Sequence, residues 1–567
     1  MVSLLGPDGM QLPQRPPAMP IGGGRSAPRP SALNGVSNTP YDAADNYSDQ
    51  MAGWYPFLWS PDGETSQFWR DRMVSRARDM ERNDGWARGG TTRILDSVIG
   101  AEFRPISKPD YRALAYYTGN KAFDAVWADE YGRVADACWR TWAGDDVSKY
   151  CDTAQRLTMP QLFWVGLRHK IIDGDALAVL QYRPETIAPG RARYATSVQL
   201  VDPDRLSNPQ LQFDTNAFRG GVEVDAYGAP IGYWIRKAHQ GDWFSAGKSQ
   251  TWDYLPRTTP WGRPVVVHDF DHHRASQHHG AVGLLTPIMQ RLKMLTKYDS
   301  VELEAAIINA VFAAYIKSPY DPQMVEQLAA GPEPETLGPY QEMRNTFWHS
   351  KRLNIGGARL SPLAPGEEIG TVSSSRPSAG YEPFSVAVLR HIASGLGVTY
   401  EQLSGDFSRT NYSSFRGATN EALKTFNRRS KSFESGFAMP IRAAFLEEVM
   451  DVEDIPLPAG APDFMEFRAA YSKCMWLRPG RGWVDPVAER QGAILGMNAG
   501  MSTLEREVAE NTGEDWEEVV DQVAVERRRF AALGLPPLPI VAALTDDGSG
   551  KESGDKPSVP KKPEAGE

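Results

Sequence analysis

The sequence predicts a mixed α+β chain whose strand-forming first half gives way to long helices. Between Ala176 and Phe270, short apolar or alternating runs are separated by Pro, Gly and Asp, a pattern typical of strands. From Ile288 to Tyr315, apolar residues recur instead at helical spacing. The chain has 567 residues, of which 41% are hydrophobic and 10% aromatic, enough for several buried cores.

The first half is predicted to begin with helices and continue as strands. Helical periodicity covers residues 65–99, with expected breaks at Asn83–Gly85 and Gly89–Gly90, and returns over Lys121–Trp142. The strands are expected at 176–183, 197–206 and 263–270. Asp225–Gly228 lies between two alternating runs and indicates a β-hairpin.

The second half is predicted to be helical around a Pro/Gly-rich excursion. Thr286 and Pro287 are suited to the N-cap and first position of a helix, which would span roughly 40–45 Å at 1.5 Å per residue. Residues 317–382 are rich in Pro and Gly, with one short apolar piece at 352–355. A second helix from Pro383, a loop at 405–417 and a long helix to about Met450 follow. Further on, Thr503 and Asp515 are expected to cap two more helices.

Composition bounds the function. The formal charge is −10 and the pI is near 5.6, which argues against a protein that grips DNA through a net positive field. Three cysteines are too few for a disulfide framework and fit a reducing, intracellular setting. The longest apolar run, Ala305–Ile316, is too short to cross a membrane, and we expect neither a signal peptide nor a membrane partner.

No enzyme motif is convincing, so we predict no catalytic, cofactor-binding or metal residues. Residues 241–249 miss the phosphate-loop spacing by one residue and are expected to form a surface loop. Asp202 and Asp204, like Glu367 and Glu368, lie in Pro/Gly-flanked turns where carboxylates ordinarily face solvent.

One segment has an unusual composition: His268–Gly280, HDFDHHRASQHHG, contains five of the nine histidines. The alternative to a non-enzyme is a metal-dependent hydrolase that uses the cluster from His268 to His279. Zinc needs three or four ligands on a rigid frame. Here His272 and His278 are six residues apart in a predicted loop, with no cysteine nearby. We therefore expect a polar, His-rich turn.

Several segments, in order, resemble the lambda-type portal proteins of tailed bacteriophages. They include WRDRMVSRARDMERND, VQLVDPDRLSNP, GVEVDAYGAPIGYWI, LAPGEEI and WVDPVAERQGAILGMNAGMSTLEREVAENTGEDWEEV. The most distinctive is LRHIASGLGVTYEQLSGDFSRTNYSS. The resemblance covers about 45–535. In it, His268, Arg274 and Gln277 resemble the family's turn into its long helix, and His279-Gly280 stands where the family usually has Arg-Gly.

The resemblance implies a portal architecture, an α/β wing with long stem helices, a small clip and a helical crown. The implied regions are a flexible leader (1–40), wing (41–283), stem helix (284–314), clip (315–382), second stem helix (383–404), tunnel loop (405–418), long wing helix and turn (419–460), C-terminal helical crown (461–540) and disordered tail (541–567).

The same resemblance implies a dodecameric ring at one capsid vertex of the virion, assembled in the host cytoplasm. Double-stranded DNA would enter and leave through it, and its partners would be the terminase large subunit, the major capsid and scaffold proteins, and head-tail connector proteins. The expected channel constriction comprises Arg409, Asn411, Tyr412, Ser413, Ser414 and Phe415. Two alternatives stay open: an ordinary polar loop at these residues, and a portal-like protein of a domesticated prophage or gene-transfer particle.

Overall fold

The computed structural model divides into two compact units, one ending at Ser60 and the other beginning at Pro61. It describes residues 41–44, 51–280, 282–311, 315–317, 346, 353–355, 358–360, 368–370, 380–408, 410–482 and 485–536. The predicted leader (1–40), the whole predicted tail (541–567) and most of the predicted clip (315–382) lie outside these residues. In the described part of the first unit, a 3₁₀ turn, η1 (Asp42–Ala44), is the only helical element.

The second unit begins with three helices, and Asp84 separates the second from the third. They are α1 (Pro61–Glu64), α2 (Gln67–Asn83) and α3 (Gly85–Val98). The Asp84 carboxylate accepts hydrogen bonds from the backbone N–H of Trp86 and Ala87 at 2.9 Å each, so the expected break there is confirmed. The expected break at Gly89–Gly90 is wrong, because both lie inside α3. Gly90 instead permits close packing, since a Cβ there would lie 2.7 Å from the Leu396 side chain.

The main core is aromatic and joins segments far apart in sequence. Its helices include α4 (Tyr111–Thr118), α5 (Ala125–Ala143) and α6 (Met159–Ile172). Helix α5 begins after the predicted Lys121 because the Asp124 carboxylate caps it at the N–H of Trp127. Trp142 stacks on Phe445 with ring centroids 4.4 Å apart. Burial of such large rings is the main source of stability in this region.

Two antiparallel sheets form the strand-rich part. One has the order β3-β2-β8 and the other β4-β5-β6-β7. Their bounds are β2 (Asp175–Tyr182), β3 (Thr196–Val201), β4 (Phe218–Arg219), β5 (Val222–Val224), β6 (Pro230–Arg236), β7 (Trp252–Pro256) and β8 (Val266–Phe270). The predicted hairpin is confirmed: the Asp225 carboxylate accepts from the N–H of Tyr227 and Ala229 at 2.8 Å, and Gly228 takes φ 82°.

Short elements connect and flank these sheets. The 3₁₀ turns are η2 (Pro184–Thr186), η3 (Pro203–Arg205), η4 (Pro209–Leu211), η5 (Trp243–Ser245) and η6 (Lys248–Gln250). The last two confirm that residues 241–249 form a loop leading to a strand. The small pairs are β1 (Arg104–Ser107) with β13 (Cys474–Leu477), β9 (Tyr315–Lys317) with β12 (Glu368–Gly370), and β10 (Leu353–Ile355) with β11 (Ala358–Leu360).

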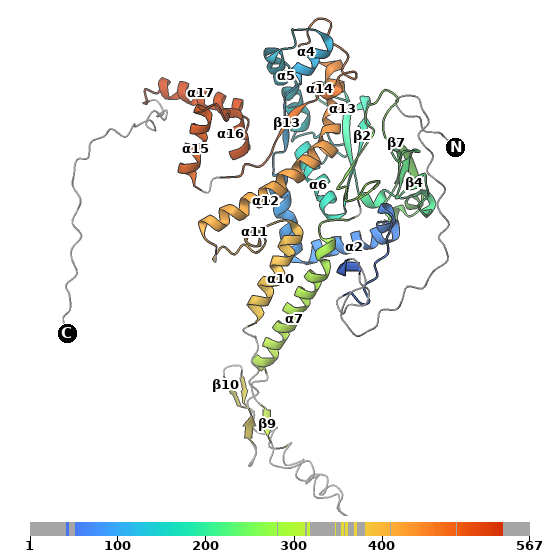
Figure 1. Ribbon diagram of the computed structural model, residues 1–567, viewed down its shortest axis with the longest axis vertical. Coiled ribbons are helices and arrows are strands. Elements are labelled where there is room, and N and C mark those ends of the chain that lie inside the picture. Colours follow the sequence, from blue (N-terminus) through green and yellow to red (C-terminus); the bar gives the residue numbers. More distant parts are fainter. Residues whose placement is uncertain are drawn as a thin grey trace, which may run out of the picture. The chain divides into compact units, whose positions relative to one another are not determined.

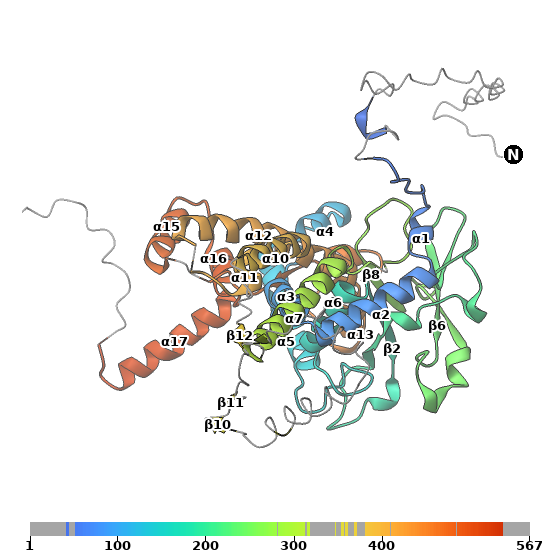
Figure 2. The same ribbon diagram turned by 90° about the horizontal axis from the view of Figure 1, so that it is seen from below.

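Two long helices run antiparallel, as Figures 1 and 2 show: α7 (Met289–Val311) and α10 (Tyr381–Leu396). At one end Gly395 of α10 meets Ile288, and at the other Tyr298 of α7 stacks on Tyr381 with ring centroids 5.7 Å apart. The turn η7 (Thr286–Ile288) precedes α7, so Thr286 is its first residue and not the predicted N-cap.

The C-terminal part is helical, as predicted. Helix α11 (Tyr400–Ser404) is followed by α12 (Tyr412–Phe433), a π-helical turn η9 (Glu434–Ala438), α13 (Met439–Val452), α14 (Arg468–Tyr471), α15 (Pro486–Asn498), α16 (Leu504–Asn511) and α17 (Trp516–Ala532). Thr503 and Asp515 cap α16 and α17 as expected. Arg104 holds Glu518 of α17 through two hydrogen bonds of 2.7 and 2.5 Å.

Two composition-based expectations can be compared with the structure. All three cysteines, Cys138, Cys151 and Cys474, are free thiols. Among the described helices, none has the length and hydrophobicity that crossing a membrane requires.

Candidate nucleic-acid interface

The predicted constriction lies where α11 turns into α12. The predicted second stem helix (383–404) is in fact two helices, because Gly397 takes the left-handed conformation at φ 70° and ends α10. Thr399 then starts α11 with a capping box: its hydroxyl accepts from the Gln402 N–H at 3.1 Å, and the Gln402 side chain accepts from the Thr399 N–H at 3.0 Å. Gly405, at φ 71°, ends α11. Two glycines and one capping box thus fix the approach to the constriction.

The predicted tunnel loop is shorter than expected. The range 405–418 was predicted as loop, but α12 begins at Tyr412 because the Asn411 carboxamide accepts a hydrogen bond from the Ser414 N–H at 2.8 Å. Asn411 is therefore a helix cap, and residues 412–418 form the first turns of α12. Arg409 lies outside the described residues.

The remaining predicted residues divide between solvent and a local contact. Ser413 and Ser414 are exposed, on the first turn of α12. Phe415 is half-buried and packs edge-on against Phe407, with ring centroids 5.6 Å apart. The two serines are thus available to a ligand, whereas Phe415 helps to hold the turn together.

Helix α12 carries five basic residues and one acidic residue, but their environments differ. Lys424 pairs with Glu421 at 2.6 Å, and Lys431 pairs with Glu434 at 2.9 Å. These pairs reduce the charge offered to a phosphate.

The three arginines of α12 also differ. Arg416 and Arg428 are exposed and have no acidic partner in the described part of the chain. Arg429 is turned inward: burial and then the charge of Arg428 lower its pKa to about 10. The exposed arginines are therefore the strongest candidates for contact with an anion.

The histidine loop, as we call His268–Gly280, begins on β8 with His268–Phe270 and is a loop from Asp271 onward, as predicted. Three of its histidines face the interior. His268 Nε2 lies 2.9 Å from the Asp175 carboxylate. Burial opposes ionisation of Asp175, but the hydrogen bond and charge of His268 outweigh it and lower the pKa of Asp175 to about 2. His278 lies between the Asp62 carboxylate and the Gly228 carbonyl, at 2.8 and 3.0 Å.

His279 is fully buried, and neither ring nitrogen has a hydrogen-bond partner. Burial, followed by the nearby charge of Arg70, lowers its pKa to about 4, so the ring is neutral at physiological pH. It packs on Gly220, where a Cβ would come within 2.6 Å of the ring. The next position has to be glycine, because a Cβ at Gly280 would lie 2.0 Å from the Gly174 carbonyl oxygen.

The other two histidines, His272 and His273, are exposed. The His272 ring lies 4.3 Å from the Phe270 ring, and the His273 main-chain N–H donates to Gln277 at 3.0 Å. In the described residues, no group of three side chains suited to a metal includes a histidine of this loop. The hydrolase alternative therefore receives no support.

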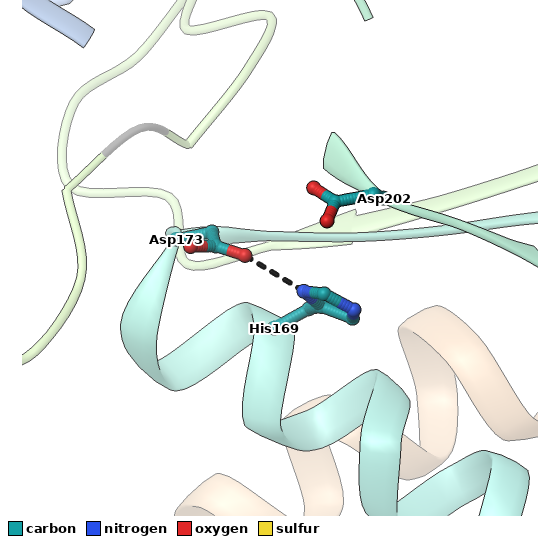
Figure 3. A group of neighbouring side chains, drawn as sticks. All are labelled: His169, Asp173 and Asp202. Carbon is teal, nitrogen blue, oxygen red and sulfur yellow. Dashed lines mark hydrogen bonds and ion pairs between the residues drawn. The ribbon is translucent and has the colours of Figure 1, made fainter. Parts of the chain in front are cut away.

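The prediction that Asp202 and Asp204 merely face solvent is wrong. Arg78 of α2 bonds to Asp173 at 2.8 Å, to Asp202 at 2.5 Å and to Asp204 at 3.3 Å. His169 Nδ1 also lies 2.7 Å from the Asp173 carboxylate, which accepts the hydrogen bond (Figure 3). The local sequence predicts the turn but does not show that an arginine more than 120 residues away pairs with its carboxylates.

This carboxylate group has the residue types of a cation site but already contains a cation. Burial opposes ionisation of Asp202, yet the charges of Arg78 and His169 lower its pKa; burial and the charge of Asp202 raise the pKa of Asp204. The Arg78 guanidinium contacts all three carboxylates, so it neutralises the position where a metal would bind.

A buried polar network, which the sequence analysis missed, fixes α12 to α6 and to β8 of the three-stranded sheet. The Lys170 ammonium lies 2.8 Å from Asp269, 3.2 Å from Asp271 and 3.0 Å from the Ser432 hydroxyl. Asp269 is packed directly against Gly436 in the π-helical turn η9. Burial raises the pKa of Asp269 to about 6 despite Lys170. The signal in the sequence was a lysine close to the apolar run LFWVGL (162–167), a stretch that the sequence analysis did not assign to any element.

Comparison with known proteins identifies the family. A profile described as phage portal protein, lambda family, matches residues 47–429. The portal protein of Escherichia phage N15 is 30% identical over 515 residues, 89% of this chain and 93% of that protein. Portal protein B of Escherichia phage lambda is 29% identical over 517 residues, 90% of this chain and 93% of that protein.

Among solved structures, the neck of an empty GTA particle covers 78% of this chain and 100% of its own, at 15% identity and a TM-score of 0.38. Family membership rests on the sequence matches; the family profile runs from before α1 to Arg429, within α12, and so includes the turn at Asn411. The chain belongs to the lambda family of phage portal proteins.

Proposed function

We propose that the chain forms a closed homo-oligomeric ring, a dodecamer, at one vertex of the capsid, and that double-stranded DNA passes through it. In this proposal the ring works with the terminase large subunit during packaging and with head-tail connector proteins afterwards. Its role is structural and mechanical, without catalysis.

The observation that carries the proposal is the start of α12. Ser413, Ser414 and Arg416 are exposed at the start of this helix. The helix is anchored further along by the buried side chains of Ala422 and Phe426. A channel wall needs rigid support and weak contacts, because every phosphate neutralised adds affinity and therefore drag. Small hydroxyls with one nearby arginine suit that need.

The exposed apolar surface of the stem helix α7 favours an oligomer. Met294, Leu303 and Ile307 are 60%, 64% and 55% exposed. Side chains of this size on one long helix are typical of surfaces that a neighbouring subunit covers. The formal charge of −10 favours a conduit over a DNA clamp.

The test has two stages. Negative-stain imaging of the purified full chain should show rings with a central hole. In a complementation assay with a portal-deficient phage of matching type, Ser413→Trp should then leave ring formation intact but yield heads without DNA. Val147→Trp, at a position 93% exposed and far along the sequence, is the matched control and should package normally. Normal packaging by Ser413→Trp would show that the start of α12 does not line the channel. A chain that never forms rings would overturn the proposal.

A further inference from the structure

The histidine loop forms one wall of an open cavity of about 1020 Å³. The other walls come from the β5–β6 hairpin, from the η9–α13 junction and from α14, so the cavity lies between the strand-rich part and the C-terminal helices. Tyr227, Tyr233, Met439 and Pro440 supply apolar surface. Its size and mixed lining fit the side chains of a peptide segment better than a single ion.

The cavity is basic although the chain is acidic. Its lining includes three arginines and four histidines and contains no aspartate or glutamate. Part of this set is already paired with carboxylates outside the lining: Arg274 with Glu64 at 2.6 Å, His278 with Asp62 at 2.8 Å and His268 with Asp175 at 2.9 Å. Arg257 has no ion-pair partner in the described part of the chain.

Arg468 is the other arginine available in the lining. It donates to the Gly262 carbonyl at 2.6 Å and likewise has no acidic partner among the described residues. The cavity therefore favours an occupant that is both apolar and acidic.

Residues 41–59, which we call the arm, have that composition. Six large side chains of the arm are exposed, from Trp59 at 51% to Leu58 at 98%; they are Tyr41, Trp54, Tyr55, Phe57, Leu58 and Trp59. The arm contains Asp42, Asp45 and Asp49, and no lysine or arginine occurs between residues 30 and 69. An aromatic, acidic segment of this kind matches the cavity in both polarity and charge.

We propose that the arm of one copy inserts into the basic cavity of a second copy, an inference that rests on the proposed ring. A ring is built from heterologous contacts in which two different surfaces of the same chain meet. The arm and the cavity are two such surfaces. Aromatic side chains and arginine are also the residues enriched at protein interfaces. The cavity rim of each copy is already held by its own Asp62 and Glu64, which leaves the interior for the neighbour.

Cysteine cross-linking in the full chain tests this. Leu58→Cys and Ala275→Cys are made as separate variants, because Leu58 is exposed in the arm and Ala275 is exposed in the cavity wall. The two are co-expressed with tags of different size, and the rings are oxidised and run on a non-reducing gel. Leu58→Cys with Val126→Cys, at a position 65% exposed on α5, is the matched control.

We expect a mixed dimer from the first pair and none from the control or from either variant alone. Arg257→Glu in the Ala275→Cys chain should lower the dimer yield several-fold, whereas Lys248→Glu, an exposed lysine outside the cavity, should leave it unchanged. Intact rings without the mixed dimer would overturn the inference while leaving the proposed function standing. A double variant that closes its disulfide within one chain would overturn it as well, since the arm would then serve its own cavity. Absence of rings in the unmodified chain would instead refute the proposed function, and this inference with it.

Discussion

The histidine loop and the start of α12 differ in how many polar side chains they leave available to a ligand, and the difference is the opposite of what their sequences suggest. The loop holds most of the chain's histidines, yet His268, His278 and His279 are used as internal partners or core residues. The start of α12 is chemically plain, yet its serines and Arg416 face solvent on a fixed helix. Reactive side chains are available to a ligand only if the fold leaves them without partners. Four predictions test this difference, from the largest effect to the smallest.

Removing the buried cation near the loop should be the most damaging change. Lys170→Met leaves Asp269 buried without its partner, so we expect a loss of about 3–5 kcal/mol in the free energy of unfolding. The urea midpoint of purified protein measures this. Lys170→Met with Asp269→Asn should recover part of the loss, and Lys424→Met, an exposed control, should change little. A loss below about 1 kcal/mol in Lys170→Met would show that the network is not structural.

Acid should destabilise the protein through His279. Its pKa is lowered to about 4 in the folded state, so between pH 6.5 and 4 only the unfolded state takes up the proton. Stability therefore falls as the pH drops through this window, by up to about 3 kcal/mol from this residue.

Thermal unfolding at pH 7 and pH 4.5 measures this loss. His279→Gln should show a smaller difference between the two pH values than the unmodified chain, and His273→Gln, an exposed control, should not. An unchanged pH dependence in His279→Gln would contradict the buried neutral ring.

The cap of α12 should have a moderate effect. Asn411→Ala removes the hydrogen bond to the Ser414 N–H and should cost about 1 kcal/mol, with the loss confined to the first turn of α12. Hydrogen exchange of the amides of residues 413–416 reports it locally. Asn411→Asp retains the cap and should behave as the unmodified chain. Equal exchange in Asn411→Ala would mean that the turn is held by Phe415 and Phe407 instead.

Arg416→Gln should have the smallest effect on stability, within about 0.5 kcal/mol, because the side chain is exposed and unpaired in the described structure. Its effect should appear in packaging, as a change in the rate at which heads fill. Lys424→Gln, already paired with Glu421, is the control and should package at the normal rate. A clear loss of stability in Arg416→Gln would contradict the difference between the two regions, because Arg416 would then stabilise the fold as the buried histidines do.

The sequence by itself determined the class of fold and the order of its elements. The hairpin at Asp225–Gly228, the helix break at Asn83–Gly85, the caps at Thr503 and Asp515, and the His-rich loop follow from local rules about turns and helix ends. Those rules act within a few residues, so a single sequence carries them. The family resemblance was also visible there, because its motifs are contiguous.

Only the tertiary structure decided which polar residues are used internally. Arg78 reaches Asp202 across 124 positions in the chain, and Lys170 reaches Ser432 across 262. The same holds for Gly90, which continues a helix instead of breaking it because Leu396 packs on it. Burial and long-range pairing set the free energy of a charge, and neither depends on sequence neighbours. The sequence thus located the groups capable of chemistry, and folding determined which of them remain exposed.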